Sequence, residues 1–179
     1  MTPPSPGFRL LRDAVLSLSL TQEFVRPLYH WRTSRPHEYR NSMLNCRGDD
    51  DQLFRAGPGD GAPPRNVRLG ADDYLLDHLG GGFDLLVFTD GPTLPDWLQD
   101  SVARLRGRGV PLRVTAVGAA AVGGADLCLP DADGHLRACY GVEAAGAAYL
   151  LRPDQHVCAR FLTLDAHRLE AAFATALPQ

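Results

Sequence analysis

The sequence predicts an α/β domain with a mixed sheet from about Asn66 to the C-terminus, preceded by a helical arm and a linker. Two compact apolar runs, residues 83–89 and 110–117, are typical of strands that are buried on both faces. A helical pattern over residues 94–106 separates them, and parallel strands need such a crossover helix. Two further apolar runs close to the C-terminus are separated by a short polar turn, which favours an added antiparallel pair.

The first half of this domain consists of short elements with clear ends. Residues 74–79 favour a short helix that ends at the three glycines 80–82. The helix over 94–106 has Pro95 in its first turn, and Asp96 complements the helix dipole there. Glycines follow this helix and end it. Residues 118–124 are small and flexible, so we expect a loop, and residues 131–140 predict a turn and a short helix.

The second half predicts a hairpin followed by a last helix. The apolar runs 147–151 and 156–162 flank the sequence Arg-Pro-Asp-Gln, and a proline followed by a polar pair is a turn sequence. Asp165 can cap a helix with apolar residues at four-residue steps: Leu169, Phe173 and Leu177. The order strand, helix, strand, helix, hairpin, helix matches the thioredoxin-like fold.

The N-terminal third predicts an amphipathic helix, an extended arm and a linker. Apolar residues over 8–28 recur at three- and four-residue steps, and Pro27 is the expected stop. Residues 47–65 contain glycines, prolines and three consecutive aspartates, which is typical of a linker. We therefore divide the chain into a helix and arm (1–46), a linker (47–65) and a thioredoxin-like domain (66–179).

Composition argues against several classes of partner. Hydrophobic residues make up 45% of the chain and charged residues 22%, which is ordinary for a globular protein. The net charge of -3 offers no electrostatic basis for binding nucleic acid or an acidic membrane surface. No apolar run approaches the roughly 20 residues of a membrane span, and the N-terminus lacks the features of a signal peptide. We expect no nucleic-acid or membrane partner, and a cytoplasmic location.

The thioredoxin-like fold raises the hypothesis of thiol redox chemistry. The chain has four cysteines and no Cys-x-x-Cys pair, so we expect free thiols that pack as small apolar groups. Redox-active members of the fold place a cysteine after the first long strand, at the N-terminus of the next helix. Residues 89–95 occupy that place and contain no cysteine. The proline that normally precedes the hairpin strand is also missing from residues 146–148.

Metal and catalytic patterns are sparse. Asp131 and Asp133 precede a glycine, which predicts a turn rather than paired catalytic carboxylates. No Gly-x-Ser-x-Gly nucleophile elbow is present. Two pairs have ligand chemistry and would form a tetrahedral site only if their elements met: His135 with Cys139, and His156 with Cys158. We expect no catalytic, cofactor-binding or metal-binding residues in this chain.

Several segments, in order, resemble FAD-dependent aromatic-ring hydroxylases of the phenol hydroxylase, 3-(3-hydroxyphenyl)propionate hydroxylase and polyketide hydroxylase types. GPGDGAPPRNVRL (57–69), followed by LLDHLGGGFDLLVF (75–88), is similar to their C-terminal domain. DADGHLRACYGVEAAGAAYLLRPDQHVCAR (131–160) resembles the closing motif of that domain, with Gln155 where the hairpin turn usually has glycine. LLRDAVLSL (10–18) resembles the helix that ends their preceding domain.

This resemblance implies a thioredoxin-like domain without the FAD and substrate domains. The nearest match to a Gly-x-Gly-x-x-Gly flavin loop, residues 57–61, follows no predicted strand and precedes no predicted helix. The resemblance therefore implies that the chain binds no cofactor itself. FAD and NAD(P)H would enter only through a separate flavoprotein part, whose reaction would be O₂-dependent ring hydroxylation.

Three functional hypotheses follow. The first is a non-catalytic structural, assembly or dimerisation module, which binds a second copy of the chain or a separately encoded flavoprotein. In the alternative, the N-terminal helix packs within its own chain. Apolar stripes and aromatic anchors favour interfaces, so the candidate interface residues are Leu11, Val15, Leu18, Tyr29, Trp31 and Tyr39. The second is a small-molecule binding module that uses the vacated thioredoxin cleft at residues 90–95. The third is a thiol redox protein that uses Cys139 or Cys158. The sequence selects no substrate and no oligomeric state.

Overall fold

The computed structural model describes residues 5–23, 37–46 and 48–177 and divides the chain into two compact units, Met1–His37 and Glu38–Gln179. The larger unit contains a five-stranded mixed sheet with the strand order β3-β2-β1-β4-β5. Its strands are β1 (Phe83–Phe88), β2 (Leu112–Gly118), β3 (Leu127–Pro130), β4 (Ala148–Leu151) and β5 (Val157–Phe161). β1, β2 and β3 are parallel, whereas β4 and β5 are antiparallel to their neighbours. The predicted α/β, thioredoxin-like fold class is confirmed.

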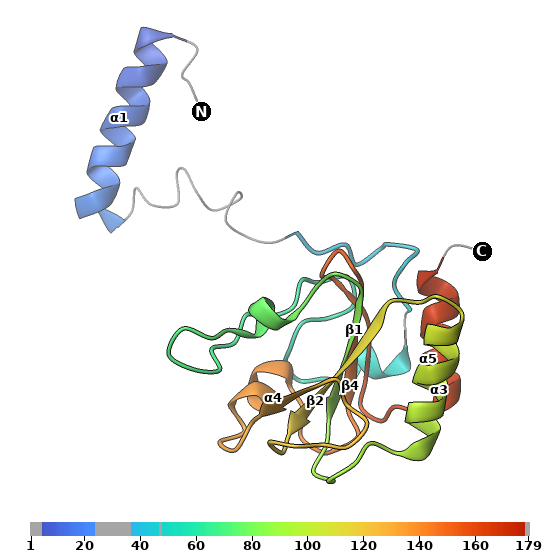
Figure 1. The fold of residues 1–179 in the computed structure, drawn as a ribbon. Helices are drawn as coiled ribbons and strands as arrows, with labels where there is room; N and C mark the ends of the chain where they lie inside the picture. The colour runs from blue at the N-terminus through green and yellow to red at the C-terminus, as the bar shows by residue number, and fades with distance from the viewer. Residues whose placement is uncertain (1–4, 24–36, 47, 178–179) are drawn as a thin grey trace. The chain divides into compact units, whose positions relative to one another are not determined.

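Helices cover both faces of this sheet (Figure 1). α3 (Asp96–Gly107) and α5 (Ala166–Ala176) pack on one face, and α4 (His135–Tyr140) packs on the other. Two short 3₁₀ turns, η2 (Asp49–Gln52) and η3 (Leu75–His78), complete the unit. Every residue of β1 is buried because successive side chains point to opposite faces and each face has its own apolar core.

The two cores are built from alternating positions of the same strands. Leu85 on β1 belongs to the core under α3 and α5, with Leu98 and Phe173. The next residue, Leu86, belongs to the opposite core, with Leu136 and Tyr140 of α4. This alternation explains why the strand reads as a continuous apolar run rather than as an amphipathic one.

Two parts of the larger unit differ from the sequence prediction. β3 was not predicted, because the strand has only four residues and most of them are half-buried or exposed. Its pairing with β2 defines it as a strand. The predicted linker, in its described part 48–65, packs against the domain instead. Val157 at the start of β5 donates to the Ala62 carbonyl and accepts from the Gly61 N–H, at 2.9 and 2.8 Å. The segment thus covers the open edge of β5, which would otherwise expose unpaired backbone groups.

The smaller unit contains one described helix, α1 (Pro6–Thr21). Ser5 caps it, with the Phe8 N–H donating to the Ser5 hydroxyl at 3.3 Å. The sequence predicted a helix to residue 28, but the last turn closes earlier: Gln22 N–H donates to the Leu18 carbonyl at 2.7 Å and the Gln22 backbone is extended. The expected stop, Pro27, lies outside the described residues. No helix in the described part of the chain is both long and apolar enough to cross a membrane.

Candidate functional site

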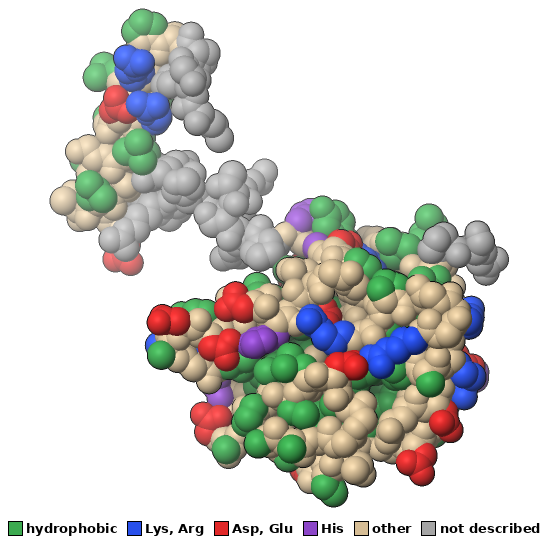
Figure 2. Space-filling model, in the orientation of Figure 1, with side chains coloured by type: hydrophobic (Ala, Val, Ile, Leu, Met, Phe, Trp, Pro, Cys, Tyr) green, Lys and Arg blue, Asp and Glu red, His purple; other side chains and the backbone are tan. Residues whose placement is uncertain are grey.

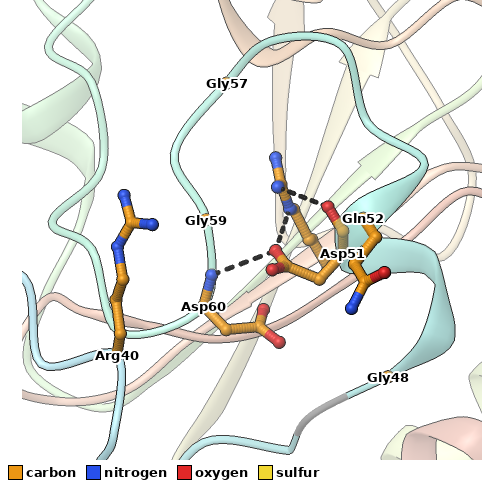
Figure 3. A pocket seen from close by; sticks show the side chains of 8 residues that line it. Arg40, Gly48, Asp51, Gln52, Gly57, Gly59 and Asp60 are labelled. Carbon is orange, nitrogen blue, oxygen red and sulfur yellow. Dashed lines mark hydrogen bonds and ion pairs between the residues drawn. The ribbon is translucent and has the colours of Figure 1, made fainter.

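A pocket of about 280 Å³ lies between the 48–60 loop and β5 (Figure 3). Its lining combines two carboxylates, two guanidinium groups, one amide and three glycines. These residues are Asp51, Asp60, Arg40, Arg160, Gln52, Gly48, Gly57 and Gly59. Because three of the eight carry no side chain, the loop backbone forms much of the wall.

Arg160 holds the loop over the strand. It lies on β5 with its side chain only 8% exposed. Its Nε donates to Asp51 Oδ1 at 2.6 Å, and its two terminal nitrogens donate to the Asp51 and Ala56 carbonyls at 2.8 and 3.0 Å. The guanidinium also lies 4.5 Å from the centre of the Phe54 ring. A buried charge needs this kind of partner set, so the loop conformation and the burial of Arg160 depend on each other.

Asp60 is the second buried charge of the pocket. Its backbone N–H donates to Asp51 Oδ1 at 3.3 Å, and Figure 3 shows its carboxylate directed into the space beside Asp51. The residue is 8% exposed, yet its Oδ1 is buried without a hydrogen-bond partner. Burial, and then the nearby Asp51 charge, raise the pKa of Asp60 to about 7. This carboxyl therefore changes its charge near neutral pH.

Two glycines with positive φ allow the loop to approach the domain this closely. At Gly57, with φ +85°, a Cβ atom would lie 2.4 Å from the Tyr140 carbonyl oxygen. At Gly61, with φ +78°, it would lie 2.3 Å from the Tyr39 carbonyl oxygen. Neither place has room for a side chain, and positive φ favours glycine. The Gly-Pro-Gly-Asp-Gly sequence thus serves to insert Asp60 into the protein.

The segment 90–95, predicted as an alternative ligand site, lies elsewhere in the domain and is joined to α4 by an ion pair. Arg137 of α4 donates to Asp90 Oδ1 at 2.5 Å and to the Thr89 carbonyl at 3.1 Å. Leu94 in the same segment is buried. A cation from α4 therefore contacts the start of the segment in which a redox-active thioredoxin would carry its nucleophilic cysteine.

Comparison with known proteins gives matches among solved structures only. No protein-family model and no curated protein matches the sequence. Aklavinone-11 hydroxylase, solved with FAD and aklavinone, is 28% identical over 80% of this chain, with a TM-score of 0.59. The flavin-dependent monooxygenase PieE, solved with FAD and substrate, is 25% identical over 79%, with a TM-score of 0.55. Substrate-free RebC, a rebeccamycin biosynthetic enzyme, shares the fold over 97% at 24% identity, with a TM-score of 0.58.

This chain is related to the FAD-dependent hydroxylases. It spans only part of them: the match covers 26% of the aklavinone-11 hydroxylase chain, 25% of PieE and 29% of RebC. The relation therefore concerns one region of a hydroxylase. The complete enzymes are about four times as long as the segment that matches this chain.

The candidate interface residues fall into both units. On α1, Leu11 is 61% and Leu18 49% exposed, while Val15 is half-buried. Apolar side chains are visible on the surface of this helix in Figure 2. Tyr39 belongs to the larger unit, is 50% exposed, and meets the His156 ring edge-on at 5.1 Å between centroids. Tyr29 and Trp31 lie outside the described residues.

The predicted ligand pairs stay separate. His135 Nε2 lies 3.9 Å from the Cys139 sulfur on α4, whereas the Cys158 thiol donates to the Leu44 carbonyl at 3.2 Å. Burial raises the pKa of Cys158 to about 12, which suppresses its thiolate. Within residues 5–23, 37–46 and 48–177, no group of three or more His, Cys, Asp or Glu side chains is placed to hold a metal ion.

Sequence reasoning missed Asp51, Asp60 and Arg160. The aspartates stood in a segment that was interpreted as a linker, and the arginine stood within an apolar run. One signal was available: a charged residue at position 160 of a buried strand requires a partner, and only an acidic segment elsewhere in the chain can supply one. Nothing in the sequence says which acidic segment that is.

Proposed function

We propose that this chain is a non-catalytic structural module of an FAD-dependent hydroxylase, which docks through α1 onto the flavin- and substrate-binding part of the enzyme. The relation to aklavinone-11 hydroxylase and PieE supports this role, since the match covers only 26% and 25% of those chains. The segment 89–95 supports it too, because it contains no cysteine at the place where a redox member of the fold carries its nucleophile.

The exposed apolar stripe of α1 is the observation that carries the proposal. Leu11, Val15 and Leu18 follow one another at helical steps of four and three residues and so lie on one face. Burying an exposed leucine side chain stabilises a complex by about 1.5–3 kcal/mol. A short helix gains most of its stability from packing of this kind, and a docked neighbour supplies it.

The chain's own glycine-rich loop does not fit FAD. A flavin pyrophosphate binds where a glycine loop leads into the N-terminus of a helix. Here Gly57 and Gly61 face the carbonyls of Tyr140 and Tyr39, and the segment leads along β5 rather than into a helix. In the proposed function, FAD and NAD(P)H are therefore bound by the flavoprotein part.

Light scattering tests this role directly. The solution mass of the chain is measured alone and mixed with the flavin- and substrate-binding part of a hydroxylase from the same source. We expect a stoichiometric complex that the double variant Leu11→Glu/Leu18→Glu abolishes. Leu20→Glu, at a position that is 80% exposed and on the opposite side of the helix, is the matched control and leaves the complex intact.

The proposal predicts further that the complex raises the flavin-dependent activity or stability of the partner. A chain that stays monomeric and leaves the flavoprotein unbound would refute the proposal. So would a complex that tolerates glutamate at both stripe positions, since docking would then use another surface. A homodimer broken by the same two substitutions would show that the stripe binds a second copy instead.

A further inference from the structure

The pocket under the 48–60 loop contains more negative than positive charge among its buried and half-buried groups. Asp51 and an ionised Asp60 face a single buried cation, Arg160. The other arginine of the lining, Arg40, is engaged at the rim by Glu38 at 2.6 Å. The inner group of three therefore carries one uncompensated negative charge when Asp60 is ionised.

The hydrogen-bond donors of the pocket also serve Asp51 better than they serve Asp60. The side-chain N–H groups of Arg160 donate to Asp51 and Ala56, so that Asp60 interacts with the backbone N–H of Arg160 and not with its guanidinium donors. The Asp60 Oδ1 atom is shielded from solvent and accepts no hydrogen bond. A buried carboxylate oxygen without a donor costs free energy, and it lies beside a cavity that has space for a donor.

We propose that this pocket binds an organic monocation with several N–H donors, a guanidinium or alkylammonium group, which bridges Asp60 and Asp51. One positive charge neutralises the excess, and its N–H groups supply the donor that Asp60 Oδ1 lacks. A guanidinium fits carboxylates in pairs through parallel hydrogen bonds. This site lies within the larger unit and does not depend on docking through α1.

The size and lining of the cavity agree with such a group. About 280 Å³ accommodates a small cationic head rather than a cofactor. Gly59 leaves the wall open, since a Cβ there would lie 3.4 Å from Asp51 Oδ1 and 3.6 Å from an Arg160 terminal nitrogen. Two carboxylates in the lining repel anions such as phosphate. A bound metal ion is not supported, since no described set of three ligands exists.

Protons compete with this cation for Asp60. The charged groups around the carboxyl are Asp51, Arg160 and Arg40 of the same pocket lining, with Cys46 and Cys158 nearby. Burial raises the pKa of both thiols, so neither adds charge near neutral pH. Since the pKa of Asp60 is about 7, the affinity for a cation rises about tenfold between pH 6 and pH 8.

The test is an NMR titration of the ¹⁵N-labelled full chain with methylguanidinium, methylammonium and the neutral isostere methylurea. We expect saturable shifts of the amides around Asp60 with the two cations, and none with methylurea. Asp60→Asn weakens binding by at least about tenfold. The matched control Asp72→Asn removes the same charge from an exposed loop position and leaves binding unchanged.

A second arm identifies the natural source of the cation. A capped Gly-Arg-Gly peptide that binds more tightly than methylguanidinium identifies an arginine side chain of a partner protein, and the reverse order identifies a free small molecule. The proposal is overturned if neither cation shifts the Asp60 region, if Asp60→Asn binds as well as the wild type, or if the affinity is the same at pH 6 and pH 8.

Discussion

Replacing Asp60 with asparagine is expected to stabilise the protein, and to do so more strongly as the pH rises. Asparagine keeps the size of the side chain and the backbone N–H bond to Asp51, but it removes a charge that is buried and lacks a partner on one oxygen. Substitution of a buried polar group usually costs stability. Here the substitution is expected to increase stability, because the carboxylate that it removes destabilises the folded protein.

The magnitude follows from the pKa. Burial raises the pKa of Asp60 from 3.8 to about 7, so between these pH values the folded protein binds more protons than the unfolded chain. Stability therefore falls as the pH rises through this window and stays constant above it. About three pH units at about 1.4 kcal/mol each amount to about 4 kcal/mol above pH 7. At pH 5 the raised pKa of Asp60 lowers the unfolding free energy by about 2 kcal/mol.

Urea denaturation of the wild type and of Asp60→Asn at pH 5, 6.5 and 8 measures this difference. We expect the advantage of the variant in unfolding free energy to grow by roughly 2–3 kcal/mol from pH 5 to pH 8. Asp72→Asn, at an exposed position, corrects for the general effect of one charge fewer and shows no such growth. Addition of methylguanidinium at pH 8 narrows the difference in stability between the two proteins, because the cation binds the wild type more tightly than the variant.

Two results would refute this reasoning. Parallel stability curves for the wild type and Asp60→Asn between pH 5 and pH 8 would mean that Asp60 titrates at an ordinary pKa. A variant that is less stable than the wild type at pH 8 would mean that the carboxylate has a partner that balances its charge.

Three further predictions concern the groups around the pocket and the core. Arg160→Met keeps the apolar stem but removes the guanidinium that binds the 48–60 loop. We expect urea denaturation to show an unfolding free energy lower by about 3 kcal/mol. A decrease below about 1 kcal/mol would contradict the role of Arg160 in holding the loop. Tyr149→Phe leaves the Tyr140 carbonyl without the hydroxyl that donates to it at 2.5 Å, and we expect urea unfolding to show a loss of about 1–2 kcal/mol; an unchanged stability would mean that this hydrogen bond contributes nothing. Cys158 is fully buried, and burial raises the pKa of its thiol to about 12, so mass spectrometry after iodoacetamide treatment at pH 8 should find it unmodified until denaturant is added; fast labelling in the native protein would show that the Glu38–Gln179 unit opens locally.

Local patterns in the sequence were sufficient for most of the fold. The apolar run at 83–89 predicted β1, and Asp165 was identified as a cap, which the structure confirms through its 2.8 Å hydrogen bond from the Arg168 N–H. The polar turn at 152–155 predicted the β4–β5 hairpin. Each of these signals lies within a few residues, because helix hydrogen bonds, caps and tight turns all join near neighbours in the chain.

The elements that were missed depend on distant neighbours. Leu129 is the one buried residue of β3, so its own sequence carries little of the apolar pattern of a strand. The 48–65 segment has the glycines, prolines and aspartates of a linker, yet Asp50 accepts hydrogen bonds from the Leu162 N–H at 2.8 Å and from Arg168 at 2.7 Å. Acidic residues are exposed in most chains, and composition alone cannot identify those that have buried cationic partners.

The sequence by itself determined the class of the fold, its relation to the FAD-dependent hydroxylases and the absence of a Cys-x-x-Cys pair. Only the tertiary structure decided that Arg160, Asp51 and Asp60 meet in one pocket, although the first two are 109 positions apart in the chain. It also decided that Arg137 of α4 pairs with Asp90. The physical reason is that secondary structure follows from short-range sterics and hydrogen bonds. The burial and pKa of a charge depend instead on which segments pack around it.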